Sequence, residues 1–397
     1  MLIQTFRRWL LELLCCLLAS GAVYADDLRV PTQTETLGML SARQFAELDA
    51  RFGAVQTAYK SRKISDEDLR AAFRVFYVPD PALEKEYLAW VKNSPKSYVA
   101  HLATGIYYKK LGQDIRGDKF ISETSAENLR GMEEQFAKAS PQLEASLALD
   151  DKPLLSLLHM INIQQFEGDI PTARRLLDRS LVIDPKNFII RNVFMISLQT
   201  RWGGSVEQME AYLKECAHAG LSTEHYKALA SLVIEDQGWV HQYQEGDYAS
   251  AIAEYEQASK LHPTENCTPC SPLSRAANLL LETKNYEDAI QQFNKILAIA
   301  PGEITARAGR GFAELQLGQV NPALVDIHYA ADRSNAYAED LLGKMYLIGT
   351  SIPKDRDKAV EWLKQAADQG YQPAIDVLPH ALDPMATFLP QPGGPRF

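Results

Sequence analysis

Apolar side chains recur three and four residues apart along most of the chain, which is the spacing of one face of an α-helix. The segment SARQFAELDARFGAVQTAYK, which begins at Ser41, shows this period first. The segments that follow keep the period, and none alternates apolar and polar residues as a half-buried strand does. The pattern therefore predicts an all-α protein.

Two segments repeat the same order of residues. They are GDYASAIAEYEQASKLHP, which begins at Gly246, and KNYEDAIQQFNKILAIAP, which begins at Lys284. A small residue allows two helices to approach closely, an aromatic ring fills the space between repeats, and proline ends a helix. Both segments place these three residue types at the same spacing: Ala251, Tyr255 and Pro263 in the first, and Ala289, Phe293 and Pro301 in the second.

The same register continues in both directions. Ala323 lies 34 residues after Ala289, and Ala139 and Ala173 are separated by the same interval. Because Ala173 and Ala251 are 78 residues apart, ten more than two such repeats, we expect one degenerate unit between them. An internal period of this length indicates stacked helix-turn-helix repeats.

This register resembles that of the tetratricopeptide repeat. The final unit, Ala336–Ala374, resembles the related Sel-one-like repeat through Leu342-Gly343, Trp362 and the motif Ala366-Ala367-x-x-Gly370. The upstream segment Thr36–Val91, together with NSPKSYVAHLATGIYYKKLG and RWGGS, is similar to an uncharacterised bacterial domain family. The resemblance implies a right-handed α-solenoid with an N-terminal helical domain, and it assigns no chemistry to that domain.

The first 27 residues, MLIQTFRRWLLELLCCLLASGAVYADD, have the parts of a secretory signal peptide. Arg7 and Arg8 precede an apolar run, and a small-x-small motif predicts cleavage after Ala25. The alternative is an uncleaved membrane anchor, but Glu12 leaves the apolar run short for a spanning helix. No later segment reaches spanning length, so we expect a periplasmic or secreted protein with no membrane span after cleavage.

These patterns divide the chain into six segments. They are a signal peptide at 1–25, an extended segment at 26–35, a helical domain with degenerate repeat units at 36–245, tetratricopeptide-like repeats at 246–335, a Sel-one-like repeat with a capping helix at 336–379, and a disordered tail at 380–397 that is rich in proline and glycine.

The composition is that of a folded, acidic protein, with 46% hydrophobic residues, 23% charged residues and a net charge of −10. Without a clustered basic stripe, this balance argues against nucleic acid as a partner. The chain has no Gly-x-Ser-x-Gly, no phosphate-binding Gly-rich loop and no His-Glu-x-x-His motif. We therefore expect no catalytic residue, no cofactor and no metal site.

Cys267 and Cys270 form a Cys-x-x-Cys motif between two repeats. The connection that contains them is four residues longer than the register requires, and in an exported protein this favours a structural disulfide in an inserted loop. Two alternatives stay open. One is thiol–disulfide exchange, because the pair precedes a helix expected to start near Ser271. The other is part of a metal site, for which His262 is the one nearby imidazole.

The degenerate unit contributes two further predictions. Cys216 aligns with the small buried position of the second helix of a repeat, so we expect a free and buried thiol. The segment RWGGS, Arg201–Ser205, is interpreted as a turn in which Ser205 caps the following helix and Trp202 packs against a neighbour.

In an array of this type, the first helices line a concave groove that holds peptides or partner helices. The register predicts seven residues on that lining: Asn162, Gln165, Tyr243, Asn278, Phe312, Gln316 and Lys344. The sequence thus predicts an exported scaffold that binds a protein or peptide and has no catalytic activity. The rival hypotheses are a periplasmic thiol–disulfide oxidoreductase that uses Cys267 and Cys270, and a cell-wall-associated binding protein.

Overall fold

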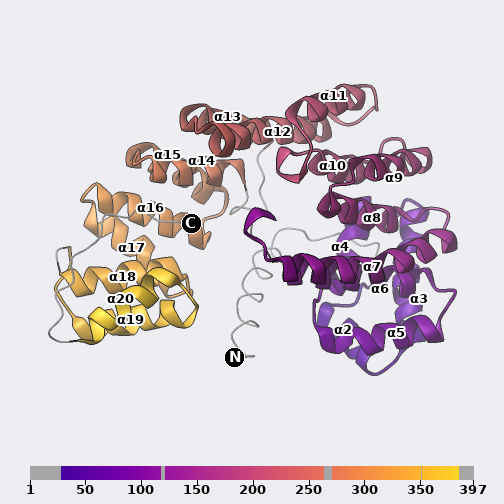
Figure 1. The fold of residues 1–397 in the computed structure, drawn as a ribbon, viewed down its shortest axis with the longest axis horizontal. Coiled ribbons are helices and arrows are strands. Elements are labelled where there is room, and N and C mark those ends of the chain that lie inside the picture. Colours follow the sequence, from indigo (N-terminus) through magenta and orange to yellow (C-terminus); the bar gives the residue numbers. More distant parts are fainter. Residues whose placement is uncertain (1–27, 118–120, 263–270, 350, 384–397) are drawn as a thin grey trace. The chain divides into compact units, whose positions relative to one another are not determined.

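The computed structural model describes residues 28–117, 121–262, 271–349 and 351–383. Within these ranges every regular element is a helix, which confirms the predicted all-α class (Figure 1). The chain divides into two compact units between Leu229 and Ala230, and each is described by itself below. Among the described residues, no helix combines the length and apolar character needed to cross a bilayer.

The N-terminal unit, which ends at Leu229, begins with short helices and continues with longer antiparallel pairs. Its helices are α2 (Gln33–Ser41), α3 (Phe45–Lys60), α4 (Asp66–Phe73), α5 (Glu84–Asn93), α6 (Tyr98–Arg116), α7 (Ala126–Leu149), α8 (Leu154–Glu167), α9 (Ile170–Ile183), α10 (Phe188–Ser197) and α11 (Val206–Ala217). The unit boundary falls inside α12 (Thr223–Val240).

An aromatic cluster forms the core between the first helices of this unit. The ring of Phe52 lies 5.3 Å from that of Phe73 and 4.7 Å from that of Phe76, measured between ring centroids. Trp90 packs on Phe76 and is fully buried, and its indole nitrogen donates to Asp49 at 3.1 Å. Each ring removes a large apolar area from water, and the Trp90 hydrogen bond satisfies the one polar atom of that side chain.

The C-terminal unit contains the described residues from Ala230 onward. Its complete helices are α13 (Tyr248–Leu261), α14 (Pro272–Glu282), α15 (Tyr286–Ile299), α16 (Ile304–Gln316), α17 (Val320–Ala331), α18 (Ala336–Ile348), α19 (Arg356–Asp368) and α20 (Gln372–Leu382). Successive helices pack side by side, and the repeat register groups them as α14 with α15, α16 with α17 and α18 with α19 (Figure 1). We call the earlier member of each pair the first helix and the later one the second helix.

Small residues on the first helices determine how closely each pair packs. A Cβ atom placed on Gly311 of α16 would lie 2.8 Å from Ile327 Cγ1 of α17, and one on Gly343 of α18 would lie 2.6 Å from Leu363 Cγ of α19. Such distances are well below van der Waals contact, so glycine alone fits there without repacking. The register alanines of the second helices, Ala139, Ala173, Ala251, Ala289 and Ala323, are all fully buried, as their pattern predicts.

Three boundaries differ from the sequence prediction. The segment predicted as extended, 26–35, already contains the start of α2, because Thr32 and Glu35 form a capping box that initiates the helix at Gln33. The unit boundary at Leu229 precedes the predicted one at residue 245. At the other end, α20 continues through Pro379 to Leu382, so the first residues assigned to the tail are helical. Residues 1–27 and 384–397, and with them the predicted signal peptide, lie outside the described ranges.

Candidate functional site

The predicted groove residues are divided between the two units. Asn162 and Gln165 lie on α8 of the N-terminal unit, and the other five lie from the end of α12 to α18 in the C-terminal unit. We therefore consider one candidate surface in each unit, in turn.

Phe312 does not present its ring to a partner, and this corrects the sequence prediction. Its side chain is 8% exposed and belongs to the core cluster that contains Ala277 and Phe293. Its ring lies 6.1 Å from that of Tyr286 and 6.0 Å from that of Tyr337. The reason is that α16 packs against α14, α15 and α18, so the ring of Phe312 faces neighbouring helices.

The other C-terminal groove positions are accessible to different degrees. Gln316 is exposed, and Asn278 and Lys344 are half-buried. Lys344 forms an ion pair with Asp340 one turn earlier on α18, with Nζ 2.6 Å from Oδ2. Tyr243 is 51% exposed and lies in a single π-helical turn, His241–Glu245, that ends the helix. These four residues keep at least part of their polar surface open to a partner.

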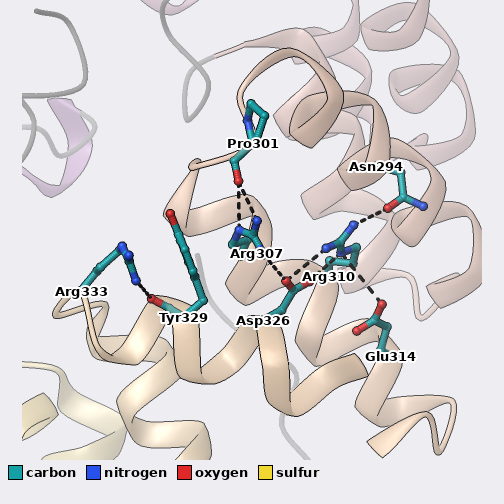
Figure 2. Close-up of polar contacts among 8 residues, drawn as sticks. All are labelled: Asn294, Pro301, Arg307, Arg310, Glu314, Asp326, Tyr329 and Arg333. Atoms are coloured by element: carbon teal, nitrogen blue, oxygen red, sulfur yellow. Dashed lines mark hydrogen bonds and ion pairs between the residues drawn. The ribbon is translucent and has the colours of Figure 1, made fainter. Parts of the chain in front are cut away.

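A charged network fixes α15, α16 and α17 to one another (Figure 2). Asp326 of α17 is almost completely buried and accepts hydrogen bonds from Arg307 at 2.8 Å and from Arg310 at 2.6 Å and 3.1 Å. Arg310 also donates to Asn294 of α15 at 2.6 Å. A buried carboxylate with two guanidinium partners has its lone pairs satisfied, so the network joins three successive helices.

The same network extends to a tyrosine that lies between two arginines. The guanidinium carbons of Arg307 and Arg333 lie 4.1 Å and 3.6 Å from the centre of the Tyr329 ring (Figure 2). Arg307 also donates twice to the carbonyl oxygen of Pro301, at 3.0 Å and 2.8 Å. Because these cations already have acceptors and a ring face, the arrangement is that of a structural staple rather than of a ligand site.

The second candidate surface is a group of basic side chains in the N-terminal unit. Lys109 of α6 is 4% exposed, and its Nζ donates to Asn162 Oδ1 of α8 at 3.2 Å. Asn162 in turn is 3.5 Å from Gln165, which is buried. His159, one turn before Asn162, is fully buried, and its Nε2 lies 3.5 Å from the hydroxyl of Tyr77. Two predicted groove residues are thus brought next to a buried lysine and a buried histidine.

Further cations lie close to Lys109 and His159. The ammonium groups of Lys109 and Lys110 lie 5.7 Å and 5.5 Å from the centre of the Tyr77 ring. Arg70 of α4 is close enough to lower the pKa of both Lys109 and His159. We call Arg70, Lys109, Lys110 and His159 the basic cluster.

Burial dominates the electrostatics of the basic cluster. It lowers the pKa of Lys109 well below its ordinary value, and the charges of Lys110 and Arg70 lower it further. The pKa of His159 is likewise lowered, first by burial and then by Lys109, Arg70 and Lys110. Burial also lowers the pKa of Lys110. The nearby carboxylate of Asp114 raises that pKa and so partly offsets the effect of burial.

The basic cluster is not apparent from the sequence pattern. Its members come from α4, α6 and α8, so no short motif contains them. Two local signals exist: Lys109 and Lys110 end the apolar run YVAHLATGIYY, and His159 interrupts the run PLLSLLHMINI. A charged or titratable residue inside such a run is an exception to the helical pattern, and only the packing of the helices shows where it points.

The structure tests one of the cysteine predictions and does not describe the residues of the other. Cys216 is free and 1% exposed, as expected, and burial raises the pKa of its thiol. Arg191 approaches it, with Nη1 3.7 Å from Sγ. Cys267 and Cys270 lie outside the described residues. Within the described part of the chain, no group of three or more His, Cys, Asp or Glu side chains is arranged to hold a metal ion.

The turn predicted for RWGGS is confirmed. Gly203 adopts the left-handed conformation with φ at 90°, and Ser205 caps α11 by accepting from the backbone of Gln208. Trp202 packs on Phe166 of α8, with ring centroids 4.9 Å apart, and the guanidinium of Arg116 lies 5.6 Å from the Trp202 ring. This segment therefore serves packing within the N-terminal unit.

Three family models match successive parts of the chain. Residues 33–171 match the Domain of unknown function (DUF4034), residues 242–308 match the Tetratricopeptide repeat, and residues 336–371 match the Sel1 repeat. The predicted combination of tetratricopeptide and Sel1 repeats with an N-terminal domain of unknown function is thereby confirmed. No curated protein sequence matches the chain.

Several solved structures are similar to this chain at low sequence identity. A Sel1 repeat protein from Oxalobacter formigenes is 16% identical, with 92% of this chain and 98% of that chain covered and a TM-score of 0.38. A protective antigen of uropathogenic Escherichia coli with an SLR fold is 14% identical, with 88% of this chain and 83% of that chain covered and a TM-score of 0.40. A tetratricopeptide repeat protein from Parabacteroides merdae is 18% identical, with 63% of this chain and 94% of that chain covered and a TM-score of 0.34.

Proposed function

We propose that this protein is an exported, non-catalytic scaffold that binds a protein or peptide partner along the first helices of its C-terminal repeats. Tetratricopeptide and Sel1 repeats generally bind protein partners, and both occur in the C-terminal half of this chain. The observation that carries the proposal is a set of accessible polar and aromatic side chains on three first helices and on the turn before α13: Asn278, Gln316, Lys344 and Tyr243.

These residues suit recognition of an extended or helical peptide. Tyr243 offers a large surface that loses little conformational entropy on binding, since Trp239 already packs against its ring at 5.3 Å between centroids. Asn278 and Gln316 supply amide donors and acceptors, and Lys344 supplies a positive charge. Because Asp340 already pairs with Lys344, we expect hydrogen bonding rather than strong charge attraction to dominate.

The export part of the proposal rests on the N-terminal sequence. Arg7 and Arg8, the apolar run and the small residues that precede Asp26 have the order of a secretory signal peptide. An exported location places any partner in the periplasm or outside the cell. Fractionation with N-terminal sequencing of the mature protein tests this, and a chain that retains Met1 in the membrane fraction would contradict it.

Partner capture tests the binding surface. The mature chain would be used to capture proteins from periplasmic extract, and the Y243A/Q316A double variant would be compared with wild type by quantitative mass spectrometry. We expect the double variant to lose a specific partner without a change in melting temperature, since both side chains are exposed. The matched control is Y248A, which removes a tyrosine of similar exposure, 46%, from α13, outside the first helices.

The outcomes of this comparison are distinct. Loss of a partner in Y243A/Q316A and its retention in Y248A support the first-helix surface. Equal capture by all three chains contradicts it, and equal loss in both variants shows that binding is not confined to the first-helix surface.

A further inference from the structure

The basic cluster of the N-terminal unit has an unusual charge balance. Among the described residues, neither Arg70 nor Lys109 nor Lys110 forms an ion pair with a carboxylate. The ammonium of Lys109 has a neutral amide, Asn162, as its hydrogen-bond acceptor. Removing a charge from water without an opposite charge is costly, so a buried ammonium of this kind either loses its proton or receives an anion.

Two buried polar atoms of the cluster also have no hydrogen-bond partner. They are Nε of Arg70 and Nδ1 of His159. Buried polar atoms are nearly always paired, and an exception in a folded protein needs an explanation. Here both atoms belong to side chains that surround the same tyrosine, Tyr77, as the two lysines do.

The cluster extends from the interior toward the surface. His159 is fully buried and Lys109 nearly so, whereas Arg70 and Lys110 are half-buried. Arg74, whose charge lowers the pKa of Tyr77, is exposed. Helices α6 and α8, which carry the deepest members, pack directly on each other (Figure 1).

We propose that the basic cluster binds a phosphate-type oxyanion, with Lys109 and Arg70 as its main ligands and Lys110 and His159 beside them. Donors from three helices that lie around Tyr77 match an anion with several oxygens, and guanidinium groups recognise phosphate through paired hydrogen bonds. Of the three lysine and arginine cations of the cluster, Lys110 has one carboxylate close to it, Asp114, so a doubly charged anion balances the cluster better than a singly charged one does.

Calorimetric titration and thermal unfolding of the mature full chain test this site. Sodium phosphate is compared with sodium chloride and sodium acetate at equal ionic strength. We expect phosphate to bind and to raise the melting temperature above both references, because a ligand that binds the folded state alone stabilises it. Phenyl phosphate is the second probe, and binding tighter than that of inorganic phosphate identifies a phosphate group on a larger molecule rather than the free ion.

Variants identify the ligand residues. K109M removes the buried charge and keeps the length of the side chain, and we expect it to weaken phosphate binding at least tenfold without lowering the melting temperature of the free protein. If K109M does not fold, K110M, which changes a half-buried lysine, is compared with wild type for phosphate binding in its place. The control is K85M, which changes a 78% exposed lysine of α5 in the same unit and leaves binding unchanged.

The proposal is overturned by any of three results. They are no phosphate effect beyond that of chloride, an acetate effect equal to that of phosphate, and phosphate binding by K109M and K110M equal to that of wild type.

Discussion

Individual buried side chains give this protein a specific response to pH. Glu339 of α18 is 1% exposed and accepts a hydrogen bond from Gln369 of α19 at 2.6 Å. Burial raises the pKa of its carboxyl group to about 7, partly offset by the hydrogen bond from Gln369. Because the unfolded chain loses this proton near the ordinary value of 4.5, the folded state binds it more tightly.

The free energy of unfolding should therefore fall as pH rises from about 4.5 to about 7 and stay at the lower level above that. E339Q keeps the acceptor for Gln369 and removes the titration. We expect it to be more stable than wild type at pH 8, by up to about 3 kcal/mol, and nearly equal at pH 4.5. Urea unfolding followed by circular dichroism at both pH values measures this. The control E361Q changes an exposed residue of α19, and an equal gain there would contradict the role of burial.

Thiol accessibility is the second prediction at this scale. Cys216 is free and buried, so alkylation should modify it after denaturation and not before. Cys267 and Cys270, outside the described residues, should form a local disulfide in the exported protein. Mass spectrometry of the alkylated protein, with and without reductant, counts the modified thiols. Disulfide-exchange turnover that is lost in C267S or C270S would instead favour the oxidoreductase hypothesis.

At the scale of helices, small residues and buried ion pairs determine how neighbouring elements fit. Glycines in similar helices have different surroundings, so the effect of helix propensity can be separated from the effect of packing against a neighbouring helix. Gly105 of α6 faces Leu143 of α7, and an added Cβ would lie 2.6 Å from Leu143 Cδ2, whereas Gly53 of α3 has no atom within 4 Å of an added Cβ.

Alanine substitution at these two glycines should have opposite signs. G53A should stabilise the N-terminal unit by about 0.5–1 kcal/mol, because alanine has the higher helix propensity and meets no neighbour. G105A gains the same propensity, but overpacking against Leu143 costs about 1–3 kcal/mol, so the net effect is destabilising. Denaturant midpoints of the two variants check the signs, and stabilisation by both would contradict the tight α6–α7 contact.

The Asp326 network should make a large contribution to the α16–α17 pair. D326A leaves Arg307 and Arg310 without their shared acceptor while their side chains remain 21% and 23% exposed. Breaking a buried pair on one side costs several kcal/mol, and partial exposure reduces this to about 2–4 kcal/mol. Thermal unfolding measures the loss. D332A, an exposed aspartate at the end of α17, should change stability little, and a similar loss there would argue against the network.

At the scale of the whole molecule, the C-terminal unit is a stack in which each pair supports the next. The last core cluster contains Leu347 of α18, Leu363 of α19 and Val377 of α20. In stacked repeats stability is close to a sum over neighbours, and terminal elements protect the apolar face of the preceding repeat.

Deleting residues 356–397 should therefore expose the face of α18 that Leu363 covers and lower the melting temperature of the C-terminal unit. Deleting only residues 384–397 removes no part of this core cluster and is the matched control. Circular dichroism during heating compares the two truncated chains with wild type. Equal melting temperatures in all three chains would show that α19 and α20 add nothing to the stack.

The sequence determined the helical class, the repeat register and the small buried positions. These follow from periodic local patterns: Ala289 and Ala323 are buried because the 34-residue spacing repeats the same helix contact each time. Helix starts such as Ser205 were also predictable, since a cap acts on the backbone within one turn.

Only the tertiary structure decided which polar side chains are buried together and which register positions stay accessible. Phe312 follows the same pattern as an exposed groove residue, but helices on both sides of α16 enclose it. Lys109 and His159 meet because α6 and α8 pack against each other, and Arg70 of α4 lies close enough to lower the pKa of both. The desolvation that makes their charges significant comes from that packing. The periodicity of the sequence indicates which face of a helix is apolar. The burial of a charged side chain depends instead on which other helices pack beside it.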